Sequence, residues 1–270
     1  MGSFFYRGFF VFSLLILLEG ATCRLDKEFS VSWAVDHVRF FKGGHKLQLT
    51  LDQNSGSGFS SKNKYLFGNI NMQIKLVPGD SAGTVTAYYL SSEGSNHDEL
   101  DFEFLGNKSG EPYVLQTNVY ASGQGDREQR IYLWFDPTKH FHSYGVIWTA
   151  QHILFMVDSV PIRVFRNHKA AGVAYPEKQA MGVYSSLWNG DNWATQGGLV
   201  KIDWSHAPFV ATYRNFSVQS MAESMGEDVR AVSSEQWKKL QWVKKNFMIY
   251  NYCNDKQRYP LPPPECSMDM

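Results

Sequence analysis

Short runs that alternate apolar and polar residues recur along most of this chain, and they restrict its fold more than any other feature. Alternation with period two is the pattern of β-strands, because successive side chains point to opposite faces. No convincing amphipathic helix occurs before residue 230. The absence of crossover helices predicts an antiparallel sandwich or jelly roll. The predicted strands are 45–52, 67–77, 83–92, 98–106, 113–121, 127–136, 141–149, 152–165, 181–188 and 207–219. The run 152–165 reads as a hairpin in which Pro161 limits the pairing.

The pattern changes near Ser234. Apolar residues recur there at helical spacing, at Trp237, Leu240, Val243 and Phe247. Ser233 or Ser234 can cap this helix, and its other face carries lysines that we interpret as solvated. We therefore predict a sandwich domain over residues 24–220 and a C-terminal extension over 221–270, with 221–234 as the linker.

The most informative segment is HDELDFEFLGNKSG, residues 97–110. On a strand, its acids Glu99, Asp101 and Glu103 share one face, and the apolar Leu100, Phe102 and Phe104 share the other. The apolar face can pack between two sheets. Aligned carboxylates repel one another and are costly to bury even partly, so a purely structural role would rarely select them.

Catalysis is the interpretation that we favour for these acids. Glycosidases use a pair of carboxyl groups, and retaining enzymes place the two groups about 5–5.5 Å apart. Residues four apart on a strand have Cα atoms about 13 Å apart, and two glutamates leaning together can close much of that gap. This argument does not exclude the wider inverting separation. A calcium site and a solvated strand edge are the alternatives.

Composition excludes some partners. Lys plus Arg and Asp plus Glu are 26 each, which argues against nucleic acid or an anionic membrane as the main partner. Aromatic residues make up 15% of the chain, a content that suits both sugar stacking and an ordinary all-β core.

The N-terminus reads as a secretory leader. Arg7 precedes the apolar run Phe9–Leu18, which is too short to span a bilayer, and small residues near Cys23 mark a cleavage site. An uncleaved anchor is the alternative.

Once Cys23 leaves with the leader 1–23, Cys253 and Cys266 remain, and we expect them to form a disulfide in an oxidising compartment. Sequons begin at Asn107 and Asn215, and we favour Asn107, which follows a strand at a glycine-rich turn.

Segments along nearly the whole mature chain resemble the plant xyloglucan endotransglucosylase/hydrolases, a branch of glycoside hydrolase family sixteen. The resemblance rests on the acidic segment, on SGSGFSSKNKYLFGNINMQIKLVPGDSAGTVTAYYLSS, on QTNVYASGQGDREQRIYLWFDPT, on SSLWNGDNWATQGGLVKIDWSHAPF and on YNYCNDKQRYPLPPPEC. It implies a concanavalin-like β-jelly roll with a short C-terminal helical extension and retaining chemistry. The acidic segment alone also fits bacterial relatives that cleave mixed-linkage glucans.

Carried over by position, the resemblance implies Glu99 as the nucleophile, Glu103 as the general acid/base and Asp101 as the residue that orients the nucleophile. His97 would support them, and Asn107 matches a glycan site. The residues that match the sugar-binding cleft are Gln116, Thr117, Asn118, Asp126, Arg127, Glu128, Trp193, Ala194, Gly198 and Arg258.

The residues themselves support part of this set. Gln116 and Asn118 are two apart, so both amides point to one face. Trp188 and Trp193 lie in a loop rich in Gly and Asn and can stack on pyranose rings, with core packing as the alternative. Tyr88 and Tyr89 face opposite ways, so at most one of them reaches the cleft.

The resemblance implies a secreted, monomeric enzyme of the apoplast that cleaves xyloglucan and rejoins it to another xyloglucan chain. It implies no cofactor and no metal, and the partners would be donor and acceptor xyloglucan, with no nucleic acid and no membrane. The alternatives are a hydrolase of xyloglucan or mixed-linkage glucan, and a non-catalytic polysaccharide-binding jelly roll. Family members usually carry a second C-terminal cysteine pair, which this chain lacks between residues 215 and 234.

Overall fold

The computed structural model describes residues 23–221 and 232–268. The predicted leader, apart from Cys23, and most of the predicted linker lie outside these ranges. The helices are α1 (Leu25–Glu28), α2 (Ser234–Asn246) and α3 (Glu265–Met268). The strands are β1 (Phe29–Trp33), β2 (Val38–Phe41), β3 (Lys46–Leu51), β4 (Ser57–Tyr65), β5 (Gly68–Lys75), β6 (Thr84–Ser91), β7 (Glu99–Leu105), β8 (Val114–Tyr120), β9 (Gln129–Tyr132), β10 (His142–Trp148), β11 (His152–Val157), β12 (Val160–Arg166), β13 (Met181–Asn189), β14 (Phe209–Gln219) and β15 (Met248–Asn251).

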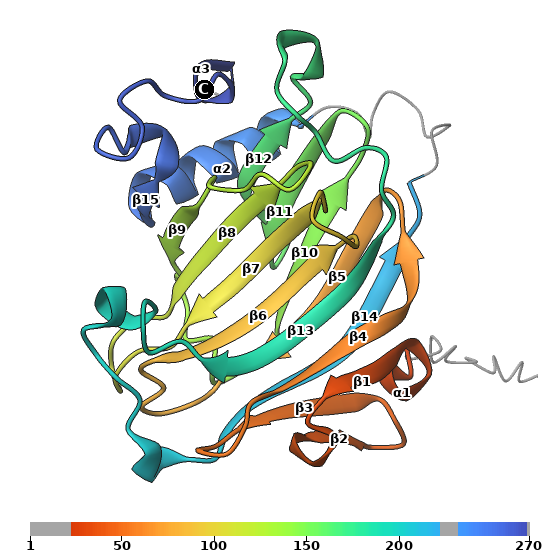
Figure 1. Ribbon diagram of the computed structural model, residues 1–270, viewed down its shortest axis with the longest axis vertical. Coiled ribbons are helices and arrows are strands. Elements are labelled where there is room, and N and C mark those ends of the chain that lie inside the picture. Colours follow the sequence, from red (N-terminus) through yellow and green to blue (C-terminus); the bar gives the residue numbers. More distant parts are fainter. Residues whose placement is uncertain (1–22, 222–231, 269–270) are drawn as a thin grey trace, which may run out of the picture.

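The strands form two antiparallel sheets that lie face to face (Figure 1). One sheet has eight strands in the order β1-β4-β13-β6-β7-β8-β9-β15, and the other has seven in the order β12-β11-β10-β5-β14-β3-β2. Every predicted run contains a strand, so the predicted all-β sandwich with a short C-terminal helix is confirmed. None of the helices within the two described ranges has the length and apolar content needed to cross a lipid bilayer.

The hairpin predicted at 152–165 is also confirmed. Strands β11 and β12 are joined at Asp158 and Ser159, which both have positive φ. Pro161 lies in β12, the end strand of its sheet, where a missing backbone N–H costs least.

Strands β1, β2, β4 and β15 were not predicted. Strand β4 reads as loop because its second half is polar and mostly exposed, yet β1 and β13 pair with it on either side. Strands β2 and β15 have four residues each, too few to show a clear period.

Aromatic residues fill the space between the sheets. Phe102 packs edge to face against Phe155, with ring centroids 5.2 Å apart, and Phe104 packs in the same way against Tyr144 at 4.6 Å. All four side chains are fully buried. Strand β7 is therefore anchored in the core by the apolar residues that lie between its acids.

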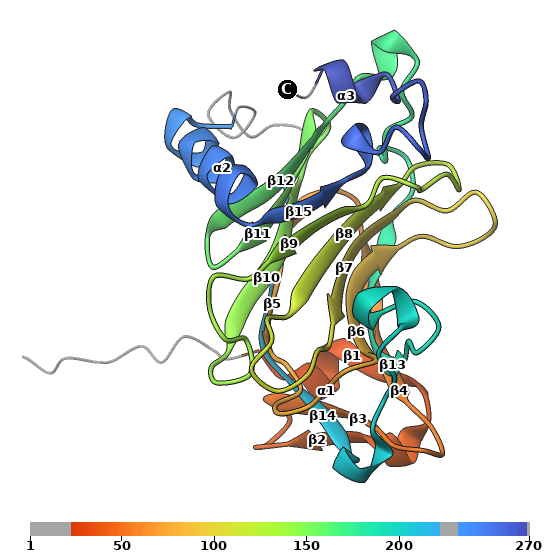
Figure 2. The same ribbon diagram turned by 90° about the vertical axis from the view of Figure 1, so that its left-hand side faces the viewer.

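Helix α2 lies over the seven-stranded sheet, at the end where β11 and β12 lie (Figure 2). A capping box between Ser233 and Gln236 begins the helix, as the sequence indicates for Ser233. Leu240 packs in a small apolar cluster with Leu154, Met156 and Val164 of these strands. After the helix, the chain adds β15 to the edge of the other sheet beside β9. The C-terminal extension thus contacts both sheets.

The predicted disulfide is present between Cys253 and Cys266. It closes a loop with a sequence separation of 13 residues, which fixes the segment that follows β15.

We expect Phe104→Ala to lower the free energy of unfolding by about 3–5 kcal/mol, because it leaves a cavity against Tyr144. Val35→Ala, at a side chain that is 73% exposed, is the control and should change it by less than about 0.5 kcal/mol. Urea titration followed by tryptophan fluorescence measures both. Equal effects of the two substitutions would contradict this account of the core.

Candidate active site

Strand β7 carries the predicted acids on the face turned away from the core. It lies between β6 and β8, so each acid has one neighbour on either side. Asp101 is paired with Tyr89 on β6 and with Asn118 on β8. Glu103 is paired with Gln116 on β8. The register therefore sets aromatic and amide side chains beside the carboxylates.

These side chains line an open cleft of about 480 Å³ across the eight-stranded sheet. The residues that line it are Ala87, Tyr89, Glu99, Asp101, Glu103, Gln116, Asn118, Tyr120, Glu128, Arg130, Ser186, Trp188, Trp193, Tyr250 and Arg258. The cleft thus brings β6, β7, β8, β9, β13, the loop after β13 and the C-terminal extension to one place. We call it the carboxylate cleft.

Asp101 is the most buried of the three acids, with 7% of its surface exposed. Burial and the charges of Glu99 and Glu103 hold its pKa well above the usual range, and the buried Arg163 opposes this only in part. The protonated Asp101 donates a hydrogen bond to Glu99. This hydrogen bond orients the carboxyl group of Glu99.

Glu103 has a different environment. Its carboxylate accepts a hydrogen bond of 2.5 Å from the Gln116 amide, and Arg130 donates to the oxygen of the same amide at 2.6 Å. Burial raises the pKa of Glu103, and the Gln116 hydrogen bond opposes that shift. Glu103 therefore holds a proton more readily than a solvated glutamate does.

His97 lies at the end of the acidic segment. Its ring stacks on Tyr120 with centroids 5.4 Å apart, and its Nε2 atom lies 3.7 Å from a Glu99 oxygen. Its Nδ1 atom is 3.1 Å from the carbonyl of Gly94. The ring is therefore held beside Glu99.

Arg258 joins the C-terminal extension to the loop before β9. Its guanidinium donates to Asp126 at 2.5 Å and to Glu128 at 2.6 Å. The hydrogen bond with Glu128 raises the pKa of Arg258 further, so it stays cationic. Tyr250 lines the cleft near it, and Arg130 lies over the Tyr250 ring at 5.4 Å.

Some of the residues predicted for the cleft do not line it. Thr117 points into the core, as strand alternation between Gln116 and Asn118 requires. Arg127 is paired with the buried Glu265 at 2.8 Å. Asp126, Ala194 and Gly198 also lie outside the lining; Ala194 packs against Val85 and Leu105.

The aromatic residues Tyr89, Trp188 and Trp193 line the cleft. Tyr89 lines the cleft while Tyr88 is fully buried, which confirms that only one of the two can reach it. Tyr89 stacks on Tyr184 with centroids 5.2 Å apart, and Trp188 lies 6.1 Å from Trp193. Strand alternation signals the placement of Tyr89 and Trp188, whereas Trp193 lies in the loop after β13. Arg130, Tyr120 and Tyr250 carry no local motif, and only the strand pairing brings them to the site.

Two further observations concern ligands and modification. Within residues 23–221 and 232–268, no group of three or more His, Cys, Asp or Glu side chains has an arrangement that could hold a metal ion. The Asn107 side chain is half-buried at the turn after β7, and its amide donates to the carbonyl of Pro112.

The combination of a hydrogen-bonded carboxylate cluster, stacked aromatic rings and an open cleft on an antiparallel sandwich defines a class: glycosidases that work through carboxyl groups. Comparison with known proteins gives the family. The chain belongs to the glycosyl hydrolases family 16, whose profile matches residues 25–206, and residues 219–266 match the xyloglucan endo-transglycosylase (XET) C-terminus.

Curated relatives are similar over most of their length. The chain is 58% identical over 270 residues to xyloglucan endotransglucosylase/hydrolase protein 15 of Arabidopsis thaliana, covering 94% of this chain and 93% of the relative. It is 56% identical over 252 residues to xyloglucan endotransglucosylase protein 2 of Diospyros kaki, covering 88% and 85%.

Solved structures share the fold at low identity. A Bacillus licheniformis β-glucanase matches with a TM-score of 0.60 at 20% identity, over 75% of this chain and 99% of that one. The Crh5 transglycosylase in complex with NAG matches with a TM-score of 0.59 at 24% identity, over 73% and 79%.

We expect Asp101→Asn to raise the melting temperature by a margin that widens from pH 4 to pH 8. The folded protein binds the Asp101 proton more tightly than the unfolded chain does, because the pKa of Asp101 is raised on folding. Its contribution to stability is therefore fully present below about pH 4, the unfolded pKa, and is lost as the pH rises through the folded pKa. An amide removes this titration.

Differential scanning calorimetry at a series of pH values measures that margin. Glu111→Gln, at an exposed carboxylate outside the cleft, is the control and should show no widening. A margin for Asp101→Asn that stays constant with pH would show that Asp101 titrates normally.

Proposed function

We propose that this chain is a secreted enzyme that cleaves the β-1,4-glucan backbone of xyloglucan and rejoins the cut end to another xyloglucan chain. The relatives named above, and the C-terminal match to xyloglucan endo-transglycosylases, support the substrate and the reaction. The observation that carries the proposal is the pairing of a half-buried Glu103, whose pKa is raised, with a Glu99 that accepts a hydrogen bond from Asp101.

The first half of the reaction uses both glutamates. A Glu99 oxygen attacks the anomeric carbon, and the glycosidic carbon–oxygen bond breaks while Glu103 gives its proton to the leaving oxygen. A covalent glycosyl-enzyme forms on Glu99, and the new end of the polysaccharide leaves. Asp101 keeps Glu99 oriented throughout.

The second half reverses these roles. Glu103, now ionised, takes a proton from the hydroxyl of an incoming glucan chain, and that oxygen displaces Glu99 from the anomeric carbon. Water in the same position gives hydrolysis instead. Transfer is favoured when an acceptor is held tightly enough to exclude water. Tyr250 and Arg258 of the C-terminal extension line the cleft with Glu128 and Arg130, and in this proposal they hold that acceptor.

The remaining cleft residues bind sugar rings and hydroxyls in this proposal. Trp188, Trp193 and Tyr89 offer flat faces for stacking. The amides of Gln116 and Asn118 offer donors and acceptors. The predicted binding residues outside the cleft lining would act on the substrate only through neighbours; these are Thr117, Asp126, Arg127, Ala194 and Gly198.

The cellular setting is also part of the proposal. The leader 1–23 would direct the chain out of the cell to the wall, where the Cys253–Cys266 disulfide is stable and Asn107 is glycosylated. We propose a monomer that needs no cofactor and binds neither nucleic acid nor membrane.

The reaction can be tested in one tube that holds the purified protein, xyloglucan and a labelled xyloglucan oligosaccharide. We expect label to enter polymer with few new reducing ends, because the acceptor competes with water for the glycosyl-enzyme. Reducing ends without incorporated label would make the protein a hydrolase. Silence in both readouts, with binding retained, would favour the non-catalytic module.

The roles of the glutamates make a second prediction. Glu103→Gln should cut xyloglucan at least about 10³-fold more slowly, because the leaving oxygen receives no proton. It should still react with an aryl glycoside of a xyloglucan oligosaccharide, whose phenolate leaves unaided. Since the base is also missing, a covalent adduct on Glu99 should accumulate and appear in the intact mass.

Glu99→Gln is the matched control and should form no adduct with the same aryl glycoside. An adduct on Glu99→Gln, or none on Glu103→Gln, would reverse or reject the assignment of roles.

A further inference from the structure

Arg163 of β12 is among the largest fully buried side chains in the described parts of the protein, with 2% of its surface exposed. Its guanidinium lies over the rings of Phe155, at 5.6 Å, and Tyr252, at 5.9 Å. Burying a charge at this depth is costly, and an apolar side chain of similar volume would often stabilise a core equally well. The position of Arg163 therefore calls for an explanation beyond packing.

The guanidinium crosses from one sheet to the other. Its Nη1 atom donates to the Thr117 carbonyl at 2.9 Å and to the Thr117 hydroxyl at 3.1 Å. Thr117 lies in β8 between Gln116 and Asn118, which both line the carboxylate cleft. Arg163 thus holds, from behind, the short stretch of strand that places the amide of Gln116 on Glu103.

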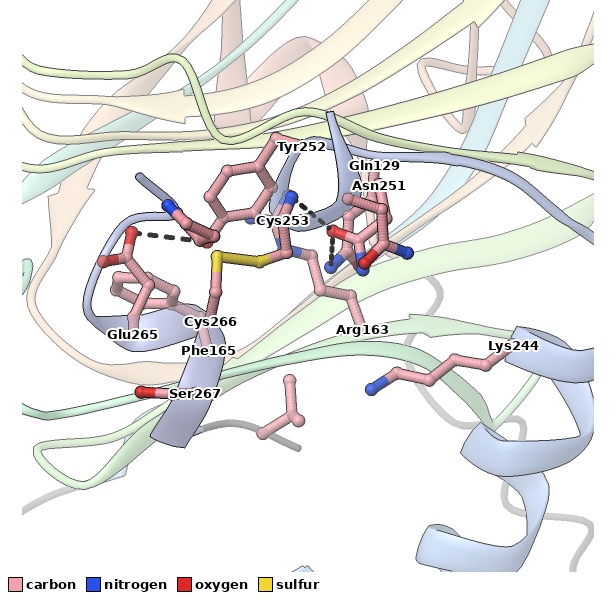
Figure 3. A pocket seen from close by; sticks show the side chains of 13 residues that line it. Gln129, Arg163, Phe165, Lys244, Asn251, Tyr252, Cys253, Glu265, Cys266 and Ser267 are labelled. Atoms are coloured by element: carbon pink, nitrogen blue, oxygen red, sulfur yellow. Dashed lines mark hydrogen bonds between the residues drawn. A yellow bond between two sulfur atoms is a disulfide. The ribbon is translucent and has the colours of Figure 1, made fainter. Parts of the chain in front are cut away.

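The C-terminal extension closes over the same guanidinium (Figure 3). Tyr252 and the Cys253–Cys266 disulfide line a cavity of about 260 Å³ together with Arg163. The Tyr252 hydroxyl is 3.3 Å from the carboxylate of Glu265, which also accepts from Arg127. Residues of this extension on either side of Tyr252 reach the carboxylate cleft, namely Tyr250 and Arg258.

We propose that Arg163 is a positioning residue for transfer: it joins β8 to the C-terminal extension and so holds the acceptor side of the cleft in register with Glu103. It touches no substrate, because it is buried and lies outside the cleft lining. Its loss lets the two parts shift relative to each other, which loosens the acceptor more than the donor. This inference rests on the proposed transfer reaction.

The test measures label incorporation and new reducing ends at a series of labelled oligosaccharide concentrations, on the full-length enzyme. Arg163→Met should raise the apparent KM for the oligosaccharide about tenfold and lower the transfer-to-hydrolysis ratio by a similar factor. The summed rate of donor cleavage should fall by less than about threefold. Arg163→Lys keeps the charge and should recover part of the acceptor KM.

Thr117→Val removes the Thr117 hydroxyl, which accepts from Arg163, with little change in shape. This variant tests the inference if Arg163→Met does not fold. It should raise the acceptor KM by a smaller factor. Combined with Arg163→Met it should add nothing, because its effect passes through Arg163. Arg166→Met, on the same strand, is the control for loss of an arginine and should keep the parent ratio.

If Arg163→Met and Thr117→Val kept the acceptor KM and the transfer-to-hydrolysis ratio of the parent enzyme, this inference alone would be overturned. Equal losses of transfer and of donor cleavage would overturn it as well. A parent enzyme that releases reducing ends but incorporates no label would overturn the proposed transfer reaction, and this inference with it.

Discussion

The position of the acids in the carboxylate cleft depends on the burial of Phe102 between the two sheets. Its ring lies against Tyr88, Tyr144 and Phe155, with centroids 5.2–6.3 Å away. Because side chains on a strand alternate, fixing Phe102 in the core puts Asp101 and its acidic neighbours on the other face. A shift of one residue would send the acids into the core and the rings into solvent, and this strongly disfavours any other register.

The electrostatic repulsion among the three acids is reduced by hydrogen bonds within and around the cluster. Burial and the charges of Glu99 and Glu103 raise the pKa of Asp101, which favours its neutral form as a hydrogen-bond donor to Glu99 and weakens the repulsion at the centre of the cluster. Glu103 is held by Gln116, which Arg130 holds in turn. In the proposed reaction, the same contacts orient Glu99 for attack on the anomeric carbon and favour the protonated form of Glu103.

The C-terminal extension is short, yet it belongs to the cleft as much as the sandwich does. It adds β15 to the eight-stranded sheet and brings Tyr250 and Arg258 to the carboxylates. The disulfide and the buried pair of Arg127 with Glu265 fasten it. Arg163 lies where this extension meets both sheets, and in our proposal it couples β8 to the extension through the interior of the protein rather than across its surface.

Alternation by itself determined that Glu99, Asp101 and Glu103 share one face of their strand, that Gln116 and Asn118 share one face of theirs, and that Tyr88 and Tyr89 point to opposite faces. These are properties of one strand, and local sequence carries them. The family resemblance matches whole segments of sequence, so it included Thr117 in the sugar-binding set together with Gln116 and Asn118. The side chain of Thr117 nevertheless points into the core. Only the tertiary structure decided that Arg130 donates a hydrogen bond to Gln116 and that Arg163 donates to Thr117. A sequence pattern specifies the face on which a side chain lies, whereas its neighbour across the sheet depends on pairing between segments far apart in the chain.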